Sequence, residues 1–353
     1  MTETGADLHR WAANTDAAGA ARWLADKTFV VVTTHTKPDG DAVGSTLALA
    51  RVLRSRGVRT EVWYLGALPP WLAEIALDTP IRSIERDGLS ADADPDGVVL
   101  LDTGSWSQLD GLLQWLAART DRTLVIDHHL HGDGDIAALR LLDTESAAAC
   151  QPVAQVCCDL LGLPSPSRLP AGVATPLYLG LATDTGWFRY SNVRPPVMRL
   201  AADLIEAGAD HTELFRVVEQ QDEPGRFRLL ATALSSLEFH ADERIALMSL
   251  RMEDFHHAKA DATDSGGFAD KVLAVRTVVV AAVLTEVSDG SQGKPPLTKI
   301  SLRSKDGPGA LDVNEIARSL GGGGHARAAG ARVTAPLAET RTRLLEALTQ
   351  ALL

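Results

Sequence analysis

The stretch Phe29-Val30-Val31-Val32-Thr33-Thr34-His35-Thr36-Lys37-Pro38-Asp39-Gly40-Asp41 decides the fold. Its β-branched run predicts a buried strand over residues 28–34, which the Pro, Asp and Gly residues end. His35, Asp39 and Asp41 should then lie at the carboxyl end of the strand, where open α/β sheets bind ligands. Two carboxylates and an imidazole so close together need a compensating cation or proton, which favours a divalent metal. A plain turn with an N-cap Asp explains the same residues.

Two further predicted strands end in acidic or imidazole side chains. Residues 97–101 end in Asp102-Thr103-Gly104, and residues 123–126 end in Asp127-His128-His129. A fourth acidic group, in Asp184-Thr185-Gly186, follows an apolar helix predicted over residues 171–181. This repetition favours one shared site over a set of unrelated turns.

The order of strand and helix patterns predicts two α/β domains. In the first part of the chain, strands alternate with helices over residues 16–26, 42–56, 107–118 and 147–161, which is typical of a parallel sheet. After a polar break at residues 220–225 and a helix over 226–239, strands at 244–250, 275–287 and 297–303 dominate. We expect an N-terminal parallel-sheet domain over residues 1–215, a helical linker over 216–238, and a smaller C-terminal α/β domain over 239–353, with a cleft between the domains.

Glycine dominates one stretch of the second domain, Gly321-Gly322-Gly323-Gly324-His325-Ala326-Arg327-Ala328-Ala329-Gly330. Four consecutive glycines let the backbone approach a ligand closely and direct its N–H groups at an anion. A flexible linker is the alternative, but this run stands between a predicted helix over 312–320 and a predicted strand. With Arg303 at the end of the preceding strand, the stretch predicts a phosphate-binding cradle.

Composition limits the partners. The 353 residues carry a net charge of −12, which argues against a broad grip on long nucleic acid but allows a short or mononucleotide substrate. The three cysteines lie in one apolar helical stretch and are expected to be buried thiols. Residues Met1–Asp7 show no signal pattern, and no apolar run approaches the ~20 residues that span a bilayer. We therefore expect a cytoplasmic protein without a membrane partner.

Together these motifs resemble a known family. His35-x-x-x-Asp39-x-Asp41, Asp102-Thr-Gly, Asp127-His128-His129 and Asp184-Thr-Gly resemble the four motifs of the DHH phosphoesterase superfamily. The stretch 321–330 resembles the signature of its DHH-associated C-terminal domain. Size and layout are most similar to NrnA-type bifunctional oligoribonucleases and phosphoadenosine phosphate phosphatases, a group with relatives that degrade cyclic di-AMP.

The resemblance implies two manganese ions, with magnesium or cobalt as substitutes. It assigns His35 and Asp39 to one ion, Asp41, His128 and Asp184 to the other, and Asp102 to a bridging position. The implied catalytic residues are Asp102, the supporting acid Asp127, and His129 facing the reacting phosphate. The implied substrate-binding residues are Phe188, Ser191, Asn192, Arg303, Gly322, Gly323, Gly324 and His325.

The predicted reaction is hydrolysis of very short oligoribonucleotides (nanoRNA, linear di-adenylate) to mononucleotides, of 3′-phosphoadenosine 5′-phosphate (pAp) to AMP, and of cyclic di-AMP. The resemblance also implies a homodimer. Trp187 and Val193-Arg194 depart from the family pattern at the rim of the site, which leaves substrate preference open. Two alternatives remain: a DHH-type inorganic pyrophosphatase, which has a different C-terminal motif, and a catalytically silent nucleotide sensor, which should lack metal ligands. A RecJ-type exonuclease is less favoured, because it needs a further nucleic-acid-binding domain for which this acidic chain lacks room.

Overall fold

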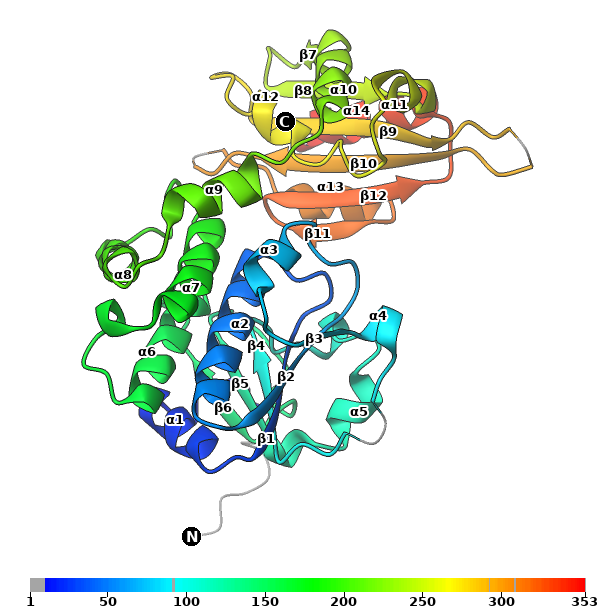
Figure 1. Ribbon diagram of the computed structural model, residues 1–353. Coiled ribbons are helices and arrows are strands. Elements are labelled where there is room, and N and C mark those ends of the chain that lie inside the picture. The colour runs from blue at the N-terminus through cyan, green and yellow to red at the C-terminus, as the bar shows by residue number, and fades with distance from the viewer. Residues whose placement is uncertain (1–9, 91–92, 292, 308, 353) are drawn as a thin grey trace. The chain divides into compact units, whose positions relative to one another are not determined.

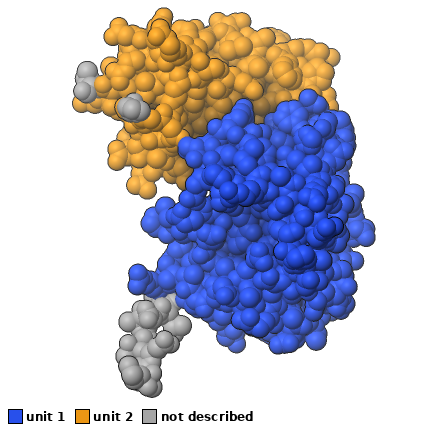
Figure 2. Space-filling model, turned by 90° about the vertical axis from the view of Figure 1, so that its left-hand side faces the viewer, with its two compact units in different colours: residues 1–220 blue, residues 221–353 orange. Residues whose placement is uncertain are grey.

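The computed structural model describes residues 10–90, 93–291, 293–307 and 309–352. It divides into two compact units, residues 1–220 and 221–353 (Figure 2). The stretch Met1–Asp7, on which the expected absence of a signal segment depends, lies outside the described residues. No helix in the part of the chain that is described has the length and apolar character to cross a lipid bilayer.

Unit 1 is built on a six-stranded sheet in the order β3-β2-β1-β4-β5-β6 (Figure 1). The strands are β1 (Phe29–Thr34), β2 (Arg59–Tyr64), β3 (Ile81–Ser83), β4 (Gly97–Leu101), β5 (Thr123–Asp127) and β6 (Leu139–Leu142). Every neighbouring pair is parallel, so the prediction of a parallel α/β sheet is confirmed. Parallel strands are buried on both faces, and the central strands β4 and β5 are buried throughout.

Helices cover both faces of this sheet. One face packs against α1 (Ala17–Ala25), α2 (Gly40–Ser55), α3 (Leu72–Ala76), α6 (Cys150–Leu161), α7 (Ala171–Asp184), α8 (Pro195–Glu206) and α9 (His211–Glu219). The other face packs against α4 (Ile84–Asp87), the short 3-10 helix η1 (Trp106–Gln108) and α5 (Leu113–Ala117). The short 3-10 helices η2 (Thr120–Arg122) and η3 (Pro166–Arg168) lie in connections. The single helix predicted over residues 107–118 is wrong, because Gly111 has a φ of +93° that an α-helix does not allow.

Unit 2 contains a second six-stranded sheet, in the order β11-β12-β10-β9-β8-β7. Its strands are β7 (Glu238–His240), β8 (Ile245–Leu250), β9 (Val280–Ser288), β10 (Leu297–Ser304), β11 (Gly323–His325) and β12 (Ala328–Val333). Only β8 and β9 run parallel within the sheet as described. One face packs against α13 (Val313–Ser319) and α14 (Leu337–Ala351). On the other face, α10 (Pro224–Ser235), α11 (Met252–Ala258) and α12 (Phe268–Val272) cover β8 and β9.

Two boundaries in unit 2 differ from the prediction. The helix expected over 226–239 ends at Ser235, and Phe239 lies in β7. The strand expected from residue 275 begins at Val280, because the preceding residues form turns after α12. The expected linker at 216–238 remains a prediction.

The glycine run forms an edge strand. Gly323, Gly324 and His325 make up β11, which pairs antiparallel with β12. A Cβ at Gly322 would overlap the carbonyl of Gly330, and a Cβ at Gly324 would overlap that of Ala328. The glycines therefore allow a close approach of two backbones, whatever ligand the strand binds.

Candidate metal centre

Three neighbouring strands bring the predicted ligands together. Because β1, β4 and β5 are adjacent and parallel, their carboxyl ends meet at one edge of the sheet. His35 follows β1, Asp102 follows β4, and Asp127 is the last residue of β5. The backbone of Asp102 has a φ of +58°, a left-handed conformation that costs energy for a residue with a side chain and that recurs at active sites.

The first turn of α2 places Asp39 and Asp41. Asp39 is the N-cap: its Oδ1 accepts hydrogen bonds from the backbone N–H groups of Asp41 and Ala42, each at 3.1 Å. The alternative interpretation of this stretch, a turn with an N-cap Asp, is therefore correct for Oδ1 of Asp39. Oδ2 takes no part in the cap and is left for another partner. The helix begins at Gly40, two residues before the predicted start, so Asp41 lies inside its first turn. A Cβ at Gly40 would overlap Thr183 at the end of α7.

Asp41 is fully buried and held by the start of α6. Its Oδ1 accepts a hydrogen bond from Cys150 N at 3.0 Å, and its Oδ2 accepts one from Ala149 N at 2.5 Å. Gly180 of α7 packs so closely that a Cβ there would meet Asp41 and the thiol of Cys150. Neither Ala149 nor Cys150 carries a motif signal, so sequence reasoning could not identify these contacts.

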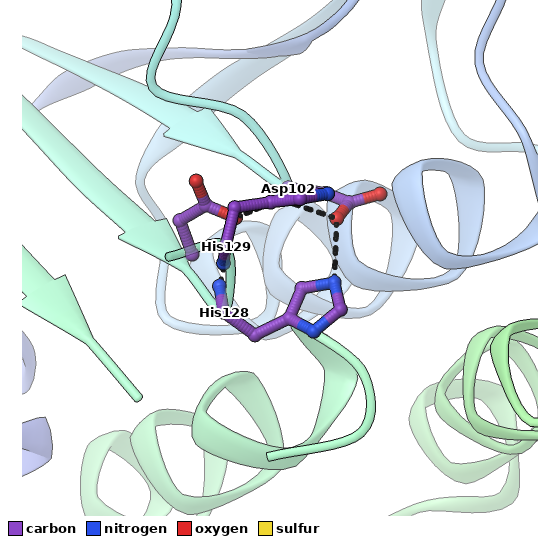
Figure 3. Close-up of side chains that lie close together, drawn as sticks. Asp102, His128 and His129 are labelled. Atoms are coloured by element: carbon purple, nitrogen blue, oxygen red, sulfur yellow. Dashed lines mark hydrogen bonds and ion pairs between the residues drawn. The ribbon is translucent and has the colours of Figure 1, made fainter. Parts of the chain in front are cut away.

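Asp102 lies between two imidazoles. Its Oδ2 is 3.6 Å from His35 Nε2. Its Oδ1 is 3.4 Å from His128 Nε2 and 3.9 Å from His129 Nδ1, and Figure 3 shows these three residues side by side. His128 Nε2 is also 3.5 Å from Asp184 Oδ2 at the end of α7. The two oxygens of one carboxylate thus face two separate groups of side chains.

Three overlapping sets of side chains have ligand atoms within 4.8 Å of one another. They are His35, Asp39 and Asp102; Asp41, His128 and Asp184; and Asp102, Asp127, His128 and His129. The first set holds the two residues that the resemblance assigns to one ion together with the bridging Asp102, and the second holds the three residues that it assigns to the other ion. The structure thus brings all six predicted ligands together, and which ion each one binds remains a prediction.

Two residues hold His129 in place: Asp127 contacts its ring, and Trp11 contacts its backbone carbonyl. Asp127 Oδ1 lies 2.7 Å from His129 Nδ1 and accepts hydrogen bonds from the backbone N–H groups of His128 and His129. The indole Nε1 of Trp11 donates a hydrogen bond to the His129 carbonyl at 3.1 Å. A Cβ at Gly104 or at Gly132 would overlap the Trp11 ring, so this ring packs between the two loops of the site. Trp11 is 118 residues away in sequence and has no motif signal.

The crowded charges shift the pKa values of the cluster. Burial disfavours the charged imidazoles, but the nearby Asp102 carboxylate outweighs it and raises the pKa of His35 to about 9 and that of His128 to about 10. Burial, followed by the charge of Asp102, raises the pKa of Asp184 to about 7 and that of Asp41 well above its ordinary value. Protons therefore balance the negative charge, and a divalent cation would supply the same compensation.

Two buried oxygens show that the residues fit a metal. Asp102 Oδ1 and Asp127 Oδ2 are buried without a hydrogen-bond partner among the described residues, although buried carboxylate oxygens are normally satisfied. The donor atoms of the cluster are carboxylate oxygens and imidazole nitrogens, a set that suits hard or borderline divalent cations. The cysteines are buried free thiols, as expected, and burial raises the pKa of Cys157 and Cys158.

The predicted substrate-binding residues of unit 1 lie beyond α7. Asn192 Nδ2 donates a hydrogen bond to the Asp184 carbonyl at 3.2 Å, which ties this loop to the cluster. Phe188 packs against Tyr178 with ring centroids 5.8 Å apart. Ser191 is exposed in the turn before α8. Trp187, at the same bend, donates a hydrogen bond to Glu219.

The predicted substrate-binding residues of unit 2 share part of one sheet face. Arg303 of β10 lies opposite Ala328 of β12, which in turn lies opposite His325 of β11. Directly opposite residues project from the same face of a sheet, so Arg303 and His325 point the same way across Ala328. Arg303 Nε is 3.4 Å from Asp270 of α12. Gly322, Gly323 and Gly324 lead into His325 along the exposed edge.

Comparisons with known proteins agree with these features. Residues 29–181 match the model of the DHH family, N-terminal domain, and residues 243–353 match that of the DHHA1 domain. The bifunctional oligoribonuclease and PAP phosphatase NrnA of Thermus thermophilus is 31% identical over 92% of this chain and 90% of its own length. The cyclic-di-AMP phosphodiesterase GdpP of Geobacillus thermodenitrificans is 24% identical over 92% of this chain but only 48% of its own.

A solved structure supports the fold. An exopolyphosphatase-related protein from Bacteroides fragilis superimposes with a TM-score of 0.85 and 26% identity, covering 95% of this chain and 96% of its own. The similarity therefore spans the whole two-unit architecture.

Proposed function

This chain belongs to the DHH family and carries a DHHA1 domain, and on that premise we propose that it hydrolyses very short oligoribonucleotides to mononucleotides and pAp to AMP. Cyclic di-AMP and its linear product are further candidate substrates, since each presents a phosphoester beside a nucleoside. The proposal makes the chain a phosphoesterase that acts on small ligands and not on long nucleic acid.

The observation that carries the proposal is the divided carboxylate of Asp102. Its Oδ2 faces His35 and its Oδ1 faces His128, as a ligand shared by two cations would require. His35 and Asp39 would hold one ion, and Asp41, His128 and Asp184 the other. A pair of bound divalent cations supplies a nucleophile at neutral pH and stabilises charge on the attacking and leaving oxygens of a phosphoester.

The protein groups around the cluster orient the reacting phosphate. Asp41 receives two backbone hydrogen bonds from the start of α6, which holds its carboxylate in one position. Asp127 fixes the ring of His129 through Nδ1, which directs Nε2 away from Asp127 and leaves it for the phosphate. The side chain of His129 is 50% exposed, whereas that of Asp127 is 0% exposed. His129 can thus contact a substrate while its support stays dry, which favours charge stabilisation at the phosphate.

The end of the substrate would be recognised in unit 2. Arg303 offers a planar set of donors that suits a phosphate, and His325 projects from the same face of the sheet. A terminal phosphate bound there would make the enzyme measure from a chain end. This favours substrates a few nucleotides long.

Manganese is the proposed metal, with magnesium and cobalt as substitutes, because the donor set consists of oxygen and imidazole. We also propose a homodimer and a cytoplasmic location. Metal analysis of the purified protein tests the proposal of manganese, and light scattering tests the proposal of a homodimer.

A substrate panel tests the function directly. Purified protein is incubated with di- to pentaribonucleotides, pAp, cyclic di-AMP, its linear product and pyrophosphate, each with manganese, magnesium or cobalt. We expect mononucleotides from the short RNAs and AMP from pAp. Faster turnover of pyrophosphate than of pAp would favour the pyrophosphatase alternative. Tight cyclic di-AMP binding without turnover of any compound would favour a sensor.

A further inference from the structure

Two cations face each other on the sheet of unit 2. Lys299 of β10 lies directly opposite Arg332 of β12, and Thr285 of β9 lies opposite Lys299 on the other side. Figure 1 shows β9, β10 and β12 as neighbouring strands, and directly opposite residues project from the same face, so the three side chains form one row. Arg303 and His325 belong to a different row of the same face, four residues further along β10.

Neither cation of this pair forms an ion pair with a carboxylate of the described residues. Like charges directly opposite each other in a sheet destabilise it. Three cations elsewhere in unit 2 do have acidic partners: Arg303 with Asp270, Arg327 with Asp306, and Arg341 with Glu238. Among the described residues, no carboxylate lies within 4.0 Å of the charged atoms of Lys299 or Arg332. An external anion would relieve the repulsion.

The two cations and residues of α11 line a pocket of about 370 Å³. Its lining includes Thr285, Lys299, Arg332 and, from α11, Met252 and Phe255. Phe255 is half-buried against the core of this unit, and Met252 is 47% exposed, so the pocket has an apolar wall beside its cationic one. Glu286 also lines the pocket, and its carboxylate accepts a hydrogen bond from Met252 N at 3.2 Å.

The pocket is separate from the proposed end-binding row. Four residues along a strand correspond to about 13 Å, so one phosphate cannot contact both Lys299 and Arg303. A ligand that fills both rows must carry at least two anionic groups. A flat apolar group next to a phosphate, as in a nucleotide, matches the combination of Phe255 with two cations.

We infer that the Lys299–Arg332 pocket is a second binding site for a phosphate group of a nucleotide or short oligonucleotide, with Phe255 contacting the base. The phosphate comes either from the inner part of a substrate whose end reaches Arg303, or from a separate nucleotide. The first source rests on the proposed function, whereas the second does not.

Binding by the full-length protein in EDTA, where hydrolysis is blocked, tests the site. Calorimetry with a 5′-phosphorylated penta-adenylate and with AMP compares the wild type with the double variant Lys299→Gln and Arg332→Gln. If the pocket holds an inner phosphate, the pentanucleotide binds at least tenfold more weakly. The slope of log K against log salt then falls by about 0.7 for each cation removed. If it holds a separate nucleotide, AMP binding falls from two equivalents per chain to one.

A matched control removes the same charge from the opposite face. Arg318→Gln with Arg343→Gln changes exposed residues of α13 and α14, the helices that cover the other side of this sheet. The control should bind both ligands like the wild type. A charge-preserving exchange, Lys299→Arg with Arg332→Lys, should retain binding and so excludes a loss due to misfolding.

Unchanged affinity, stoichiometry and salt slope in Lys299→Gln with Arg332→Gln would overturn the inference. Its failure is distinct from failure of the proposed function. If the wild type hydrolyses short RNA with manganese while the variant binds normally, only the second site is refuted. If the wild type hydrolyses nothing but the variant loses ligand, the function is refuted and the site stands.

Discussion

The cluster of unit 1 and the cationic face of unit 2 use opposite arrangements. In unit 1, Asp41, Asp102 and Asp127 are nearly or fully buried, and they converge on one sheet edge from two strand ends and a helix start. In unit 2, the edge strand Gly323–His325 is exposed, and the cations spread over two rows of a sheet face. The side chains of a buried cluster keep fixed positions away from water, which serves the chemical step. The side chains of an exposed face release water when a ligand binds, which serves affinity. Changes in unit 1 should therefore affect kcat, and changes in unit 2 should affect KM.

Asp102→Asn should have the largest effect. The substitution keeps the shape of the side chain but removes the charge that faces both His35 and His128. We expect kcat to fall on the order of 10⁴-fold, since groups that act as one unit fail together. Initial rates on pAp and on a diribonucleotide measure the effect.

Asp110→Asn is the matched control, because Asp110 is an exposed carboxylate in the segment that follows the same strand. It should retain wild-type rates. Substantial turnover by Asp102→Asn under saturating manganese would break the contrast between the units, because the buried carboxylate would then be dispensable.

Metal addition should stabilise unit 1 and not unit 2. A cation at 100 times its dissociation constant adds about 2.7 kcal/mol to the free energy of unfolding of the unit that binds it. We expect the largest gain in hydrogen-exchange protection in the segments around residues 35–41, 102–104, 127–129 and 184. Equal protection of residues 297–304 would show that the metal also binds, or acts on, the second unit. Asp102→Asn should lose most of the gain.

Arg303→Gln should raise KM with little change in kcat. A hydrogen bond to a charged group contributes about 1.5–3 kcal/mol, so KM for pAp should rise roughly 10- to 100-fold. Asp270→Asn removes the carboxylate 3.4 Å from Arg303 and should leave KM equal to or lower than that of the wild type. A fall in kcat at constant KM would assign Arg303 to the chemical step and remove the distinction between the two units.

Trp11 should show the smallest effect on rate. Trp11→Ala empties the space between Gly104 and Gly132 and removes the hydrogen bond to the His129 carbonyl. Outer contacts of this kind change activity or metal affinity by about 10- to 100-fold, and we expect the lower end of that range here. Trp11→Phe retains a ring and should recover most of the rate. If both variants lose the same activity, the hydrogen bond matters more than the packing.

The sequence predicted the metal cluster well, because its signal is local and repeated. A β-branched run followed by Asp or His at residues 35, 102 and 127 identifies strand ends, and parallel strands place those ends at one edge. The prediction of one helix over residues 107–118 was wrong, because the backbone conformation of a single glycine, Gly111, interrupts it. Nothing in the sequence indicated Trp11, whose partners lie more than 90 residues away.

The sequence by itself therefore determined the fold class and the identity of the six side chains that gather at the sheet edge. Only the tertiary structure decided which oxygen of Asp102 faces which imidazole, and that Lys299 stands opposite Arg332. The physical reason is register: a one-residue slip between β10 and β12 would move every side chain of one strand to the other face. Hydrophobic alternation identifies which residues of a strand share a face, but only the pairing of the two strands determines which residues stand opposite each other.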